Sequence, residues 1–280
     1  MFSFLESEEA PESQELRIVL LGVSGARKSS TANAILGREA FEEIRTRESE
    51  KQRGRVESRN ISVIDTPGLY DTSISEEELK AEIEKCIYMS APGPHAFLLV
   101  IRLDDRFTKE QKKKTLKWIQ KNFGEGAARY TIILFTHADV LKEKSLDEYV
   151  KDSPAHQILI DSCSGRFHSF NNEDMRNRSQ VTELLEKIEK MVKENEGKHY
   201  TSEIYKKPQE RIEQEAWKQQ MRDYGTKALT FIGGCTVAAG VVAAGGAVAG
   251  GSICIDSLLH TVLDCIFCIL IVKKIIIINK

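Results

Sequence analysis

The chain has 280 residues, enough for one sizeable hydrophobic core and an appended segment. Charged residues make up 29% of the chain and the formal net charge is -2, which argues against non-specific nucleic-acid binding, because the phosphate backbone attracts basic proteins. The charge is unevenly spread: residues 228–255 contain no ionisable acid or base apart from cysteine thiols. The sequence therefore predicts two physically different regions.

The amino-terminal residues 1–15 are acidic, contain Pro and Ser, and are predicted to form a disordered tail. They lack the basic start and the long apolar run of a secretory signal. We therefore expect a reducing, cytosolic environment in which the six cysteines are thiols. Cys265 and Cys268 have a metal or redox spacing, but no other ligand residues accompany them, so small membrane-embedded residues are the favoured interpretation.

From residue 16 onward, apolar runs typical of strands alternate with helical patterns. The run "RIVLL" predicts a strand, "SSTANAIL" a helix closed by Gly37, and "RNISVIDTPG" a second strand. Ser75 and Glu78 form a capping box, which predicts the start of a helix. The run "HAFLLVI" is typical of a strand buried on both faces, and "KEQKKKTLKWIQKNFG" of a helix.

Two further strands are predicted from "YTIILF" and "HQILIDS". A last helix carries its apolar residues on one face, namely Val181, Leu184, Leu185, Ile188, Met191 and Val192. Strands that alternate with helices predict an α/β fold with a mostly parallel sheet flanked by helices. We expect this domain to span residues 16–205, followed by a charged spacer helix over residues 206–227.

The stretch between the first strand and the first helix nearly matches the phosphate-loop pattern G-x-x-x-x-G-K-[ST]. In such a loop, successive backbone N–H groups and the helix amino terminus bind phosphate oxygens. The Lys28 ammonium would reach the β- and γ-phosphates, and the Ser29 hydroxyl would coordinate Mg²⁺. The predicted phosphate-binding residues are Gly22, Ser24, Gly25, Ala26, Arg27, Lys28, Ser29 and Ser30.

Arg27 occupies the position where these loops carry a second glycine. If that position needs a positive φ, a residue other than glycine costs about 1–2 kcal/mol. Its side chain would point to solvent or add positive charge near the phosphates. Taken alone, the imperfect loop is equally compatible with a strand-to-helix turn that carries a surface lysine.

Two further motifs follow predicted strands in the order expected of a GTPase. Asp65 opens "DTPG", where a carboxylate holds Mg²⁺ and the Gly68 N–H meets a γ-phosphate. Asp139 ends "THAD", where a carboxylate accepts the N1 and N2 protons of guanine, and His137 replaces the usual lysine. Each acid alone is compatible with a solvated charge at a strand end, but three motifs in this order favour a guanine-nucleotide site.

In these motifs the chain resembles the immunity-associated GTPases (GIMAP, or AIG-type), which are related to the septin-like and chloroplast-import GTPases. The resemblance covers about residues 16–213 and includes "STANAILG", "PGPHAFLLVI", "FNN" and "IEKMVKENEG". The stretch "DDRFTKEQ" is similar to the signature box of this family. The resemblance implies a P-loop GTPase fold, GTP or GDP with Mg²⁺ as ligands, and a role in immune cells.

The resemblance also implies roles for particular residues. Thr46 matches the first switch threonine, which contacts Mg²⁺ and the γ-phosphate, so the implied metal ligands are Ser29, Thr46 and Asp65. Asn172 matches an asparagine close to the base, and His137 a position where the family tolerates residues other than lysine. Arg106 matches an arginine that acts on the partner's nucleotide in a dimer; the alternative is a solvated charge at a helix start.

Two departures from the motifs bear on activity. Arg27 makes nucleotide affinity or hydrolysis uncertain, and Leu69 stands where many GTPases have a glutamine that orients the attacking water. We therefore expect slow GTP hydrolysis that is accelerated by a homo- or hetero-dimer with related GTPases, formed across the nucleotide face. The alternative is a pseudo-GTPase scaffold in which Arg27 impairs phosphate binding.

Residues 228–272 are predicted to anchor the chain in a membrane, because the apolar run 228–255 exceeds the roughly 20 residues that a bilayer requires. Gly246 and Gly250 have a spacing that lets membrane helices approach closely. A second run, 258–272, contains Asp264, which costs about 2.5–3.5 kcal/mol in lipid, so one span and a hairpin both stay open. A glycine-rich core segment is the soluble alternative. The predicted location is the cytosolic face of an intracellular membrane.

Overall fold

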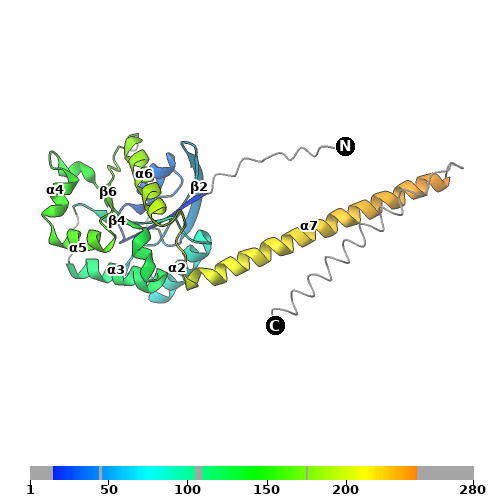
Figure 1. Ribbon diagram of the computed structural model, residues 1–280, viewed down its shortest axis with the longest axis horizontal. Coiled ribbons are helices and arrows are strands. Elements are labelled where there is room, and N and C mark those ends of the chain that lie inside the picture. Colours follow the sequence, from blue (N-terminus) through cyan, green and yellow to red (C-terminus); the bar gives the residue numbers. More distant parts are fainter. Residues whose placement is uncertain (1–14, 44–45, 105–108, 175, 245–280) are drawn as a thin grey trace. The chain divides into compact units, whose positions relative to one another are not determined.

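The computed structural model describes residues 15–43, 46–104, 109–174 and 176–244. The chain divides into two units, Met1–Glu215 and Ala216–Lys280. The first unit contains the sheet and the helices that cover it (Figure 1).

A six-stranded sheet forms the centre of the first unit, in the order β2-β3-β1-β4-β5-β6. Neighbouring strands are parallel, except that β2 runs antiparallel to β3. The carboxyl ends of β1, β3, β4 and β5 therefore meet at one edge of the sheet, where α/β proteins bind ligands. The strands are β1 (Leu16–Gly22), β2 (Glu50–Val56), β3 (Arg59–Asp65), β4 (Ala96–Arg102), β5 (Thr131–Thr136) and β6 (Phe167–Ser169).

Helices connect the strands and cover both faces of the sheet (Figure 1). Successive strand residues point to opposite faces, so β1 contributes Ile18 and Leu20 to a core beneath α1 and α6, and Val19 and Leu21 to a core beneath α2, α3 and α5. The helices are α1 (Lys28–Leu36), α2 (Glu76–Ser90), α3 (Lys109–Phe123), α4 (Leu146–Lys151), α5 (Pro154–Ser162), α6 (Ser179–Glu194), and the 3-10 turns η1 (Glu125–Tyr130) and η2 (Ala138–Leu141).

The predicted α/β class and mostly parallel sheet are confirmed. The capping box at the start of α2 is present: the Glu78 N–H donates to Ser75 Oγ at 3.2 Å, and the Ser75 N–H donates to Glu78 Oε2 at 2.9 Å. In α6 the predicted apolar face is buried against the sheet. Cys86 and Cys163 are buried free thiols, and burial raises the pKa of Cys163 to about 12.

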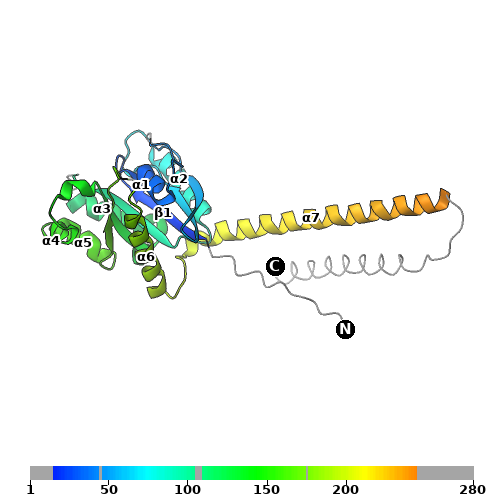
Figure 2. The ribbon, with the colours of Figure 1, turned by 90° about the horizontal axis from the view of Figure 1, so that it is seen from above.

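The prediction of a strand over "HQILIDS" is wrong, because these residues belong to α5. Pro154 occupies the first turn of this helix, where its missing N–H has no cost. His156, Leu159 and Ile160 are the buried residues, which is a helical spacing rather than an alternation. Helices α4 and α5 lie side by side in both views (Figure 1, Figure 2). The sixth strand, β6, is a three-residue segment that follows α5.

Strand β2 is absent from the sequence-based prediction. Its sequence, EKQRGRV, is charged, and Val56 is its one fully buried residue. A strand at the edge of a sheet exposes most of its side chains, so the hydrophobic alternation used for prediction is missing. Its pairing with β3, from Glu50 opposite Asp65 to Val56 opposite Arg59, identifies it.

Helix α7 (Glu203–Ala244) contains the predicted spacer, begins before Pro208, and continues into the predicted membrane segment. Tyr205 in its first turn is fully buried in the first unit, 3.3 Å from Ser90 through their hydroxyl oxygens. No helix in the described part of the chain is both long and apolar enough to cross a membrane. The predicted tail, apart from Glu15, and residues 245–272 of the predicted membrane segment lie outside the described residues.

His95 and His168, two of the buried histidines of the first unit, form hydrogen bonds with the backbone. His95 Nδ1 accepts the Arg17 backbone N–H at 3.0 Å, and His168 Nε2 lies 2.8 Å from the Gln180 carbonyl oxygen. Burial lowers the pKa of His95 to about 3 and that of His168 to about 4. Both imidazoles are therefore neutral in the folded protein at pH 6, where an unfolded chain would begin to protonate them.

We expect the free energy of unfolding to fall as the pH falls from 6.5 toward 4. The folded pKa values lie below the unfolded value of about 6.5, so the unfolded state binds more protons in this window, and each histidine contributes a slope of up to about 1.4 kcal/mol per pH unit. Urea unfolding at pH 7, 6 and 5 measures this slope. It should be smaller in His168→Gln, and an unchanged slope in that variant would contradict the assignment.

Candidate functional site

The turn between β1 and α1 has a backbone that few residues other than glycine would permit. Gly22 has a φ of 154°, and a Cβ on it would lie 2.4 Å from the Val100 carbonyl oxygen of β4. Gly25 has a φ of 79°. The Ala26 N–H donates to the Val23 carbonyl at 3.3 Å, which closes the turn. The chain thus forms a tight loop that leads into the amino terminus of α1.

Arg27 adopts the left-handed conformation, with φ 70° and ψ 35°. The condition set out from the sequence is met, because φ is positive, and the strain relative to glycine is about 1–2 kcal/mol. Arg27 makes no side-chain cap on α1. The first N–H groups of the helix and its dipole together favour an anion at this point.

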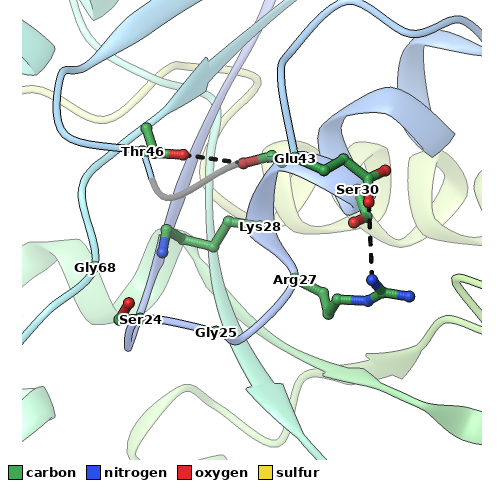
Figure 3. Close-up of a pocket in the computed structure, with 9 residues that line it drawn as sticks. Ser24, Gly25, Arg27, Lys28, Ser30, Glu43, Thr46 and Gly68 are labelled. Carbon is green, nitrogen blue, oxygen red and sulfur yellow. Dashed lines mark hydrogen bonds and ion pairs between the residues drawn. The ribbon is translucent and has the colours of Figure 1, made fainter.

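The Arg27 side chain extends away from the loop rather than across it. Its Nη2 lies 2.6 Å from Glu173 Oε1, and its Nη1 lies 3.8 Å from Glu43 Oε2. Figure 3 shows Lys28 pointing toward Ser24 and Gly68, whereas Arg27 extends in the other direction, toward Glu43. The arginine therefore leaves the space above the loop open.

Lys28 is buried, and its ammonium donates to the carbonyl oxygens of Gly22 at 3.3 Å and Val23 at 3.2 Å. Burial lowers the pKa of Lys28, while the carboxylates of Asp65 and Asp71 raise it. Its ammonium thus lies under the loop, held by backbone oxygens, in the position from which a lysine reaches phosphate oxygens.

Three oxygen-bearing side chains from separate elements meet beside Lys28. Ser29 Oγ donates to Asp65 Oδ2 at 2.6 Å, Thr46 Oγ1 donates to the same oxygen at 3.2 Å, and the two hydroxyls lie 3.0 Å apart. Burial raises the pKa of Asp65, and Lys28 lowers it. Asp65 Oδ1 is buried and has no hydrogen-bond partner among the described residues. Hard oxygen donors with an unused carboxylate oxygen fit Mg²⁺.

Gly68 lies against the phosphate loop. A Cβ at this position would lie 2.6 Å from both the N and the Cα of Ser24, so a larger residue would push the two loops apart. The adjacent Leu69 N–H donates to the Gly22 carbonyl at 2.9 Å. The loop after β3 is thereby fixed directly over the loop after β1.

These residues surround a pocket of about 320 Å³. Apart from two glycines, its lining residues carry polar or charged side chains, among them the Lys28 ammonium, which suits a phosphate group. The lining residues are Ser24, Gly25, Arg27, Lys28, Ser29, Ser30, Glu43, Thr46 and Gly68.

The residues predicted to contact guanine lie in two loops joined to the phosphate loop. Thr136, at the end of β5, donates from Oγ1 to the Ala26 carbonyl at 3.1 Å. Asn172 is buried and donates from Nδ2 to Thr31 Oγ1 of α1 at 3.2 Å, while its Oδ1 has no hydrogen-bond partner within the described residues. The Ala138 N–H donates to the Phe170 carbonyl at 3.2 Å, which connects these two loops.

His137 and Asp139 differ in exposure. His137 has a left-handed φ of 58° and is half-buried, whereas the Asp139 side chain is exposed. Neither residue lines the 320 Å³ pocket. The structure thus brings the predicted phosphate-binding residues together in one cavity, whereas the predicted guanine-binding residues lie on adjoining loops. Arg106 lies outside the described residues.

Sequence reasoning did not identify Glu43 and Glu173, the two carboxylates that pair with Arg27. Glu173 directly follows the "FNN" motif, and Glu43 precedes Thr46 by three residues. Neither lies in a recognisable pattern of its own. The signal that could have indicated these partners was Arg27 itself, because an arginine in place of the loop glycine needs acidic partners for its charge.

Comparison with known proteins agrees with this architecture. The model of the AIG1 family matches residues 16–220. The chain belongs to the AIG1 family.

Relatives of this AIG1-family chain include GTPase IMAP family member 8 from Homo sapiens, 34% identical over 204 residues, a region covering 70% of this chain and 30% of the relative. Immune-associated nucleotide-binding protein 9 from Arabidopsis thaliana is 36% identical over 206 residues, which cover 69% of this chain and 60% of the relative. The chain thus spans less than two thirds of the length of these relatives.

Among solved structures, the fold is similar to that of Toc33 from Arabidopsis thaliana in complex with Mg²⁺ and GMPPNP. The TM-score is 0.51 at 21% identity, over 64% of this chain and 85% of Toc33. A structure of Toc33 with GDP and Mg²⁺ gives a TM-score of 0.50 at 19% identity, over 64% of this chain and 84% of Toc33. At these identities the similarity shows a common α/β P-loop fold.

Proposed function

We propose that the chain binds GTP and GDP together with Mg²⁺ and hydrolyses GTP slowly. The observation that carries the proposal is that Lys28 and Ser29 line one pocket after β1, and that Ser29 is hydrogen-bonded to Asp65 at the end of β3. Membership of the AIG1 family and the names of its GTPase and nucleotide-binding relatives support the same conclusion.

In this proposal the phosphate chain lies in the loop between β1 and α1. The backbone N–H groups of the loop and the Lys28 ammonium bind phosphate oxygens, while Ser29, Thr46 and Asp65 hold Mg²⁺. Bound Mg²⁺ neutralises charge on the β- and γ-phosphates. Gly68, packed against Ser24, presents its N–H from the other side of the pocket.

Slow hydrolysis follows from the residue after Gly68. Leu69 is buried, with 1% of its surface exposed, and its side chain carries no polar group. It cannot orient an attacking water as a glutamine does in faster GTPases. GTP hydrolysis by this chain therefore depends on how the phosphates are positioned, and a second protein molecule accelerates it.

Guanine selectivity is assigned to Asp139 and Asn172. The exposed carboxylate of Asp139 is free of ion pairs within the described residues and accepts the N1 and N2 protons of guanine. Asn172 contributes a buried amide whose Oδ1 is unpaired among the described residues. Adenine has no equivalent pair of donors, so the site distinguishes GTP from ATP.

Calorimetric titration of the full chain with GDP and with GTP, in the presence of Mg²⁺, tests the proposal. Lys28→Ala should weaken binding by about 10- to 100-fold, because a charge-assisted hydrogen bond to phosphate is lost. The exposed Lys113→Ala in α3 is the matched control and should leave the affinity unchanged. A folded wild-type chain that gives no binding heat would instead indicate a pseudo-GTPase scaffold.

We further propose that the GTP-bound chain forms a homo- or hetero-dimer with related GTPases across its nucleotide face. One structure of Toc33, with a TM-score of 0.50, is described as a dimerization-deficient mutant, so that protein dimerises. The family resemblance assigns Arg106 to the partner's nucleotide in such a dimer. A cationic side chain delivered from a second molecule would stabilise the charge that hydrolysis develops.

The GTPase rate per molecule should therefore rise with protein concentration in the wild type. Arg106→Ala should remove this rise, because the charge supplied to the partner's nucleotide is lost, and Arg129→Ala, an exposed arginine, should keep it. Phosphate release at several protein concentrations, with sedimentation in GMPPNP, gives both quantities. A rate independent of concentration in the wild type would exclude the dimer mechanism.

Residues 228–272 are proposed to tether the domain to the cytosolic face of an intracellular membrane, where it acts as a switch or scaffold in immune cells. The support for tethering is the absence of ionisable acids and bases over residues 228–255, apart from thiols. The support for an immune role is the naming of the relatives as immune-associated proteins.

Flotation of the full chain with phospholipid vesicles measures the tether. The double change Val241→Asp and Val242→Asp should reduce the floated fraction strongly, because each carboxylate inside the bilayer costs about 2.5–3.5 kcal/mol. The same two charges placed on the exposed spacer, as Gln219→Asp and Gln220→Asp, should leave most of the protein bound to vesicles. Equal loss in both variants would refute insertion of residues 228–255.

A further inference from the structure

Arg27 is bonded to carboxylates from two separate segments. Glu173 Oε1 accepts its Nη2–H at 2.6 Å, and Glu43 Oε2 lies 3.8 Å from its Nη1. The exposed fractions of the three side chains are 33% for Arg27, 44% for Glu43 and 64% for Glu173. The arginine is therefore the most buried member of this acidic-basic cluster and lies between its two partners.

Both carboxylates border the region assigned to the nucleotide. Glu43 lines the 320 Å³ pocket together with Thr46, and Glu173 follows Asn172 directly. Charges closer than about 10 Å interact at 0.1 M salt. An unpaired carboxylate at this position would repel the phosphates of a bound nucleotide. An acidic residue in the lining of a polyanion site requires a counter-charge.

Arg27 supplies that counter-charge. Within the described part of the chain, the ion pairs of Glu43 and of Glu173 are both formed with Arg27. With its backbone in the left-handed conformation, Arg27 keeps the loop in the shape that a glycine would give it. Its side chain leaves the cavity open, as Figure 3 shows. Arg27 thus preserves the backbone function of the missing glycine and adds an electrostatic one.

We propose that Arg27 is a positioning residue that neutralises Glu43 and Glu173, and that nucleotide affinity depends on this neutralisation rather than on a direct contact between Arg27 and phosphate. The inference rests on the proposed nucleotide-binding function and deepens it. It reverses the expectation drawn from the motif, because restoring the glycine would leave Glu43 unpaired in the lining of the phosphate pocket and Glu173 unpaired next to Asn172. The substitution of arginine for glycine is then a functional feature of this chain.

A double-mutant cycle on the full chain tests this role, with GDP and Mg²⁺ as the probe. Arg27→Gln should weaken binding by about fivefold, the effect expected of partly exposed ion pairs. In the background Glu43→Gln with Glu173→Gln, the same change should alter the affinity by less than about twofold. Arg27→Lys, which keeps the charge, should retain most of the affinity, and Arg38→Gln, two residues after the end of α1, controls for general loss of positive charge.

The salt dependence gives a second readout that a purely structural role would not change. The fivefold difference between wild type and Arg27→Gln should shrink as the ionic strength rises from 0.1 to 1 M, where the screening length falls to about 3 Å. A fivefold loss that persists in the glutamine background would show that Arg27 contacts phosphate directly and would overturn the inference. Tighter binding by Arg27→Gln would overturn it as well.

Failure of this inference is distinguishable from failure of the proposed function. A wild-type chain that binds no nucleotide refutes the proposed function and the role of Arg27 together. A wild-type chain that binds GDP, with a cycle that shows no coupling between Arg27 and the two glutamates, refutes the role of Arg27 alone.

Discussion

The hydrogen bond from Ser29 to Asp65 is the interaction on which the rest of the candidate site depends. It joins the first turn of α1 to the end of β3 at 2.6 Å, between two buried residues. Thr46 is attached to the same carboxylate oxygen, so a segment without regular structure is fixed by the same acid. Because a buried carboxylate is costly without partners, these elements stabilise one another only when all are in place.

Glycine makes this convergence possible. Gly22 allows β1 to pass within contact distance of the Val100 carbonyl, and Gly68 allows the loop after β3 to lie on Ser24. Arg27 shows the limit of that requirement. Its position demands a left-handed backbone but leaves room for a side chain that extends toward Glu43 and Glu173. A cost of about 1–2 kcal/mol is acceptable in a loop held from both sides.

The family match and the charge distribution divide the chain at nearly the same place. The AIG1 family model ends at residue 220, shortly before the run without ionisable acids or bases begins at residue 228. The matched region contains the sheet, both hydrophobic cores and all the described candidate site residues. Residues 221–280 lie outside the family match, and the chain spans only part of the length of its relatives.

The sequence by itself determined the fold class, the order of most elements and the identity of the three motifs. These features depend on local periodicity, on caps such as Ser75 with Glu78, and on short residue spacings. The sequence raised the question of whether Arg27 has a positive φ, and the structure answers it with a value of 70°. Local patterns failed for two elements whose burial depends on their neighbours in the fold. Strand β2 is a charged edge strand and lacks the hydrophobic alternation of a predicted strand. Helix α5 was mistaken for a strand because its apolar run is short.

Only the tertiary structure decided which side chains meet. Ser29 and Thr46 donate to the same oxygen of Asp65, and Asn172 donates to Thr31. Arg27 pairs with Glu43 and Glu173. These contacts join residues up to 146 positions apart in the sequence. Sequence spacing carries no information on such distances, because the parallel sheet brings the ends of its strands together through long connections. The geometry of the site is therefore a property of the packed sheet and its loops.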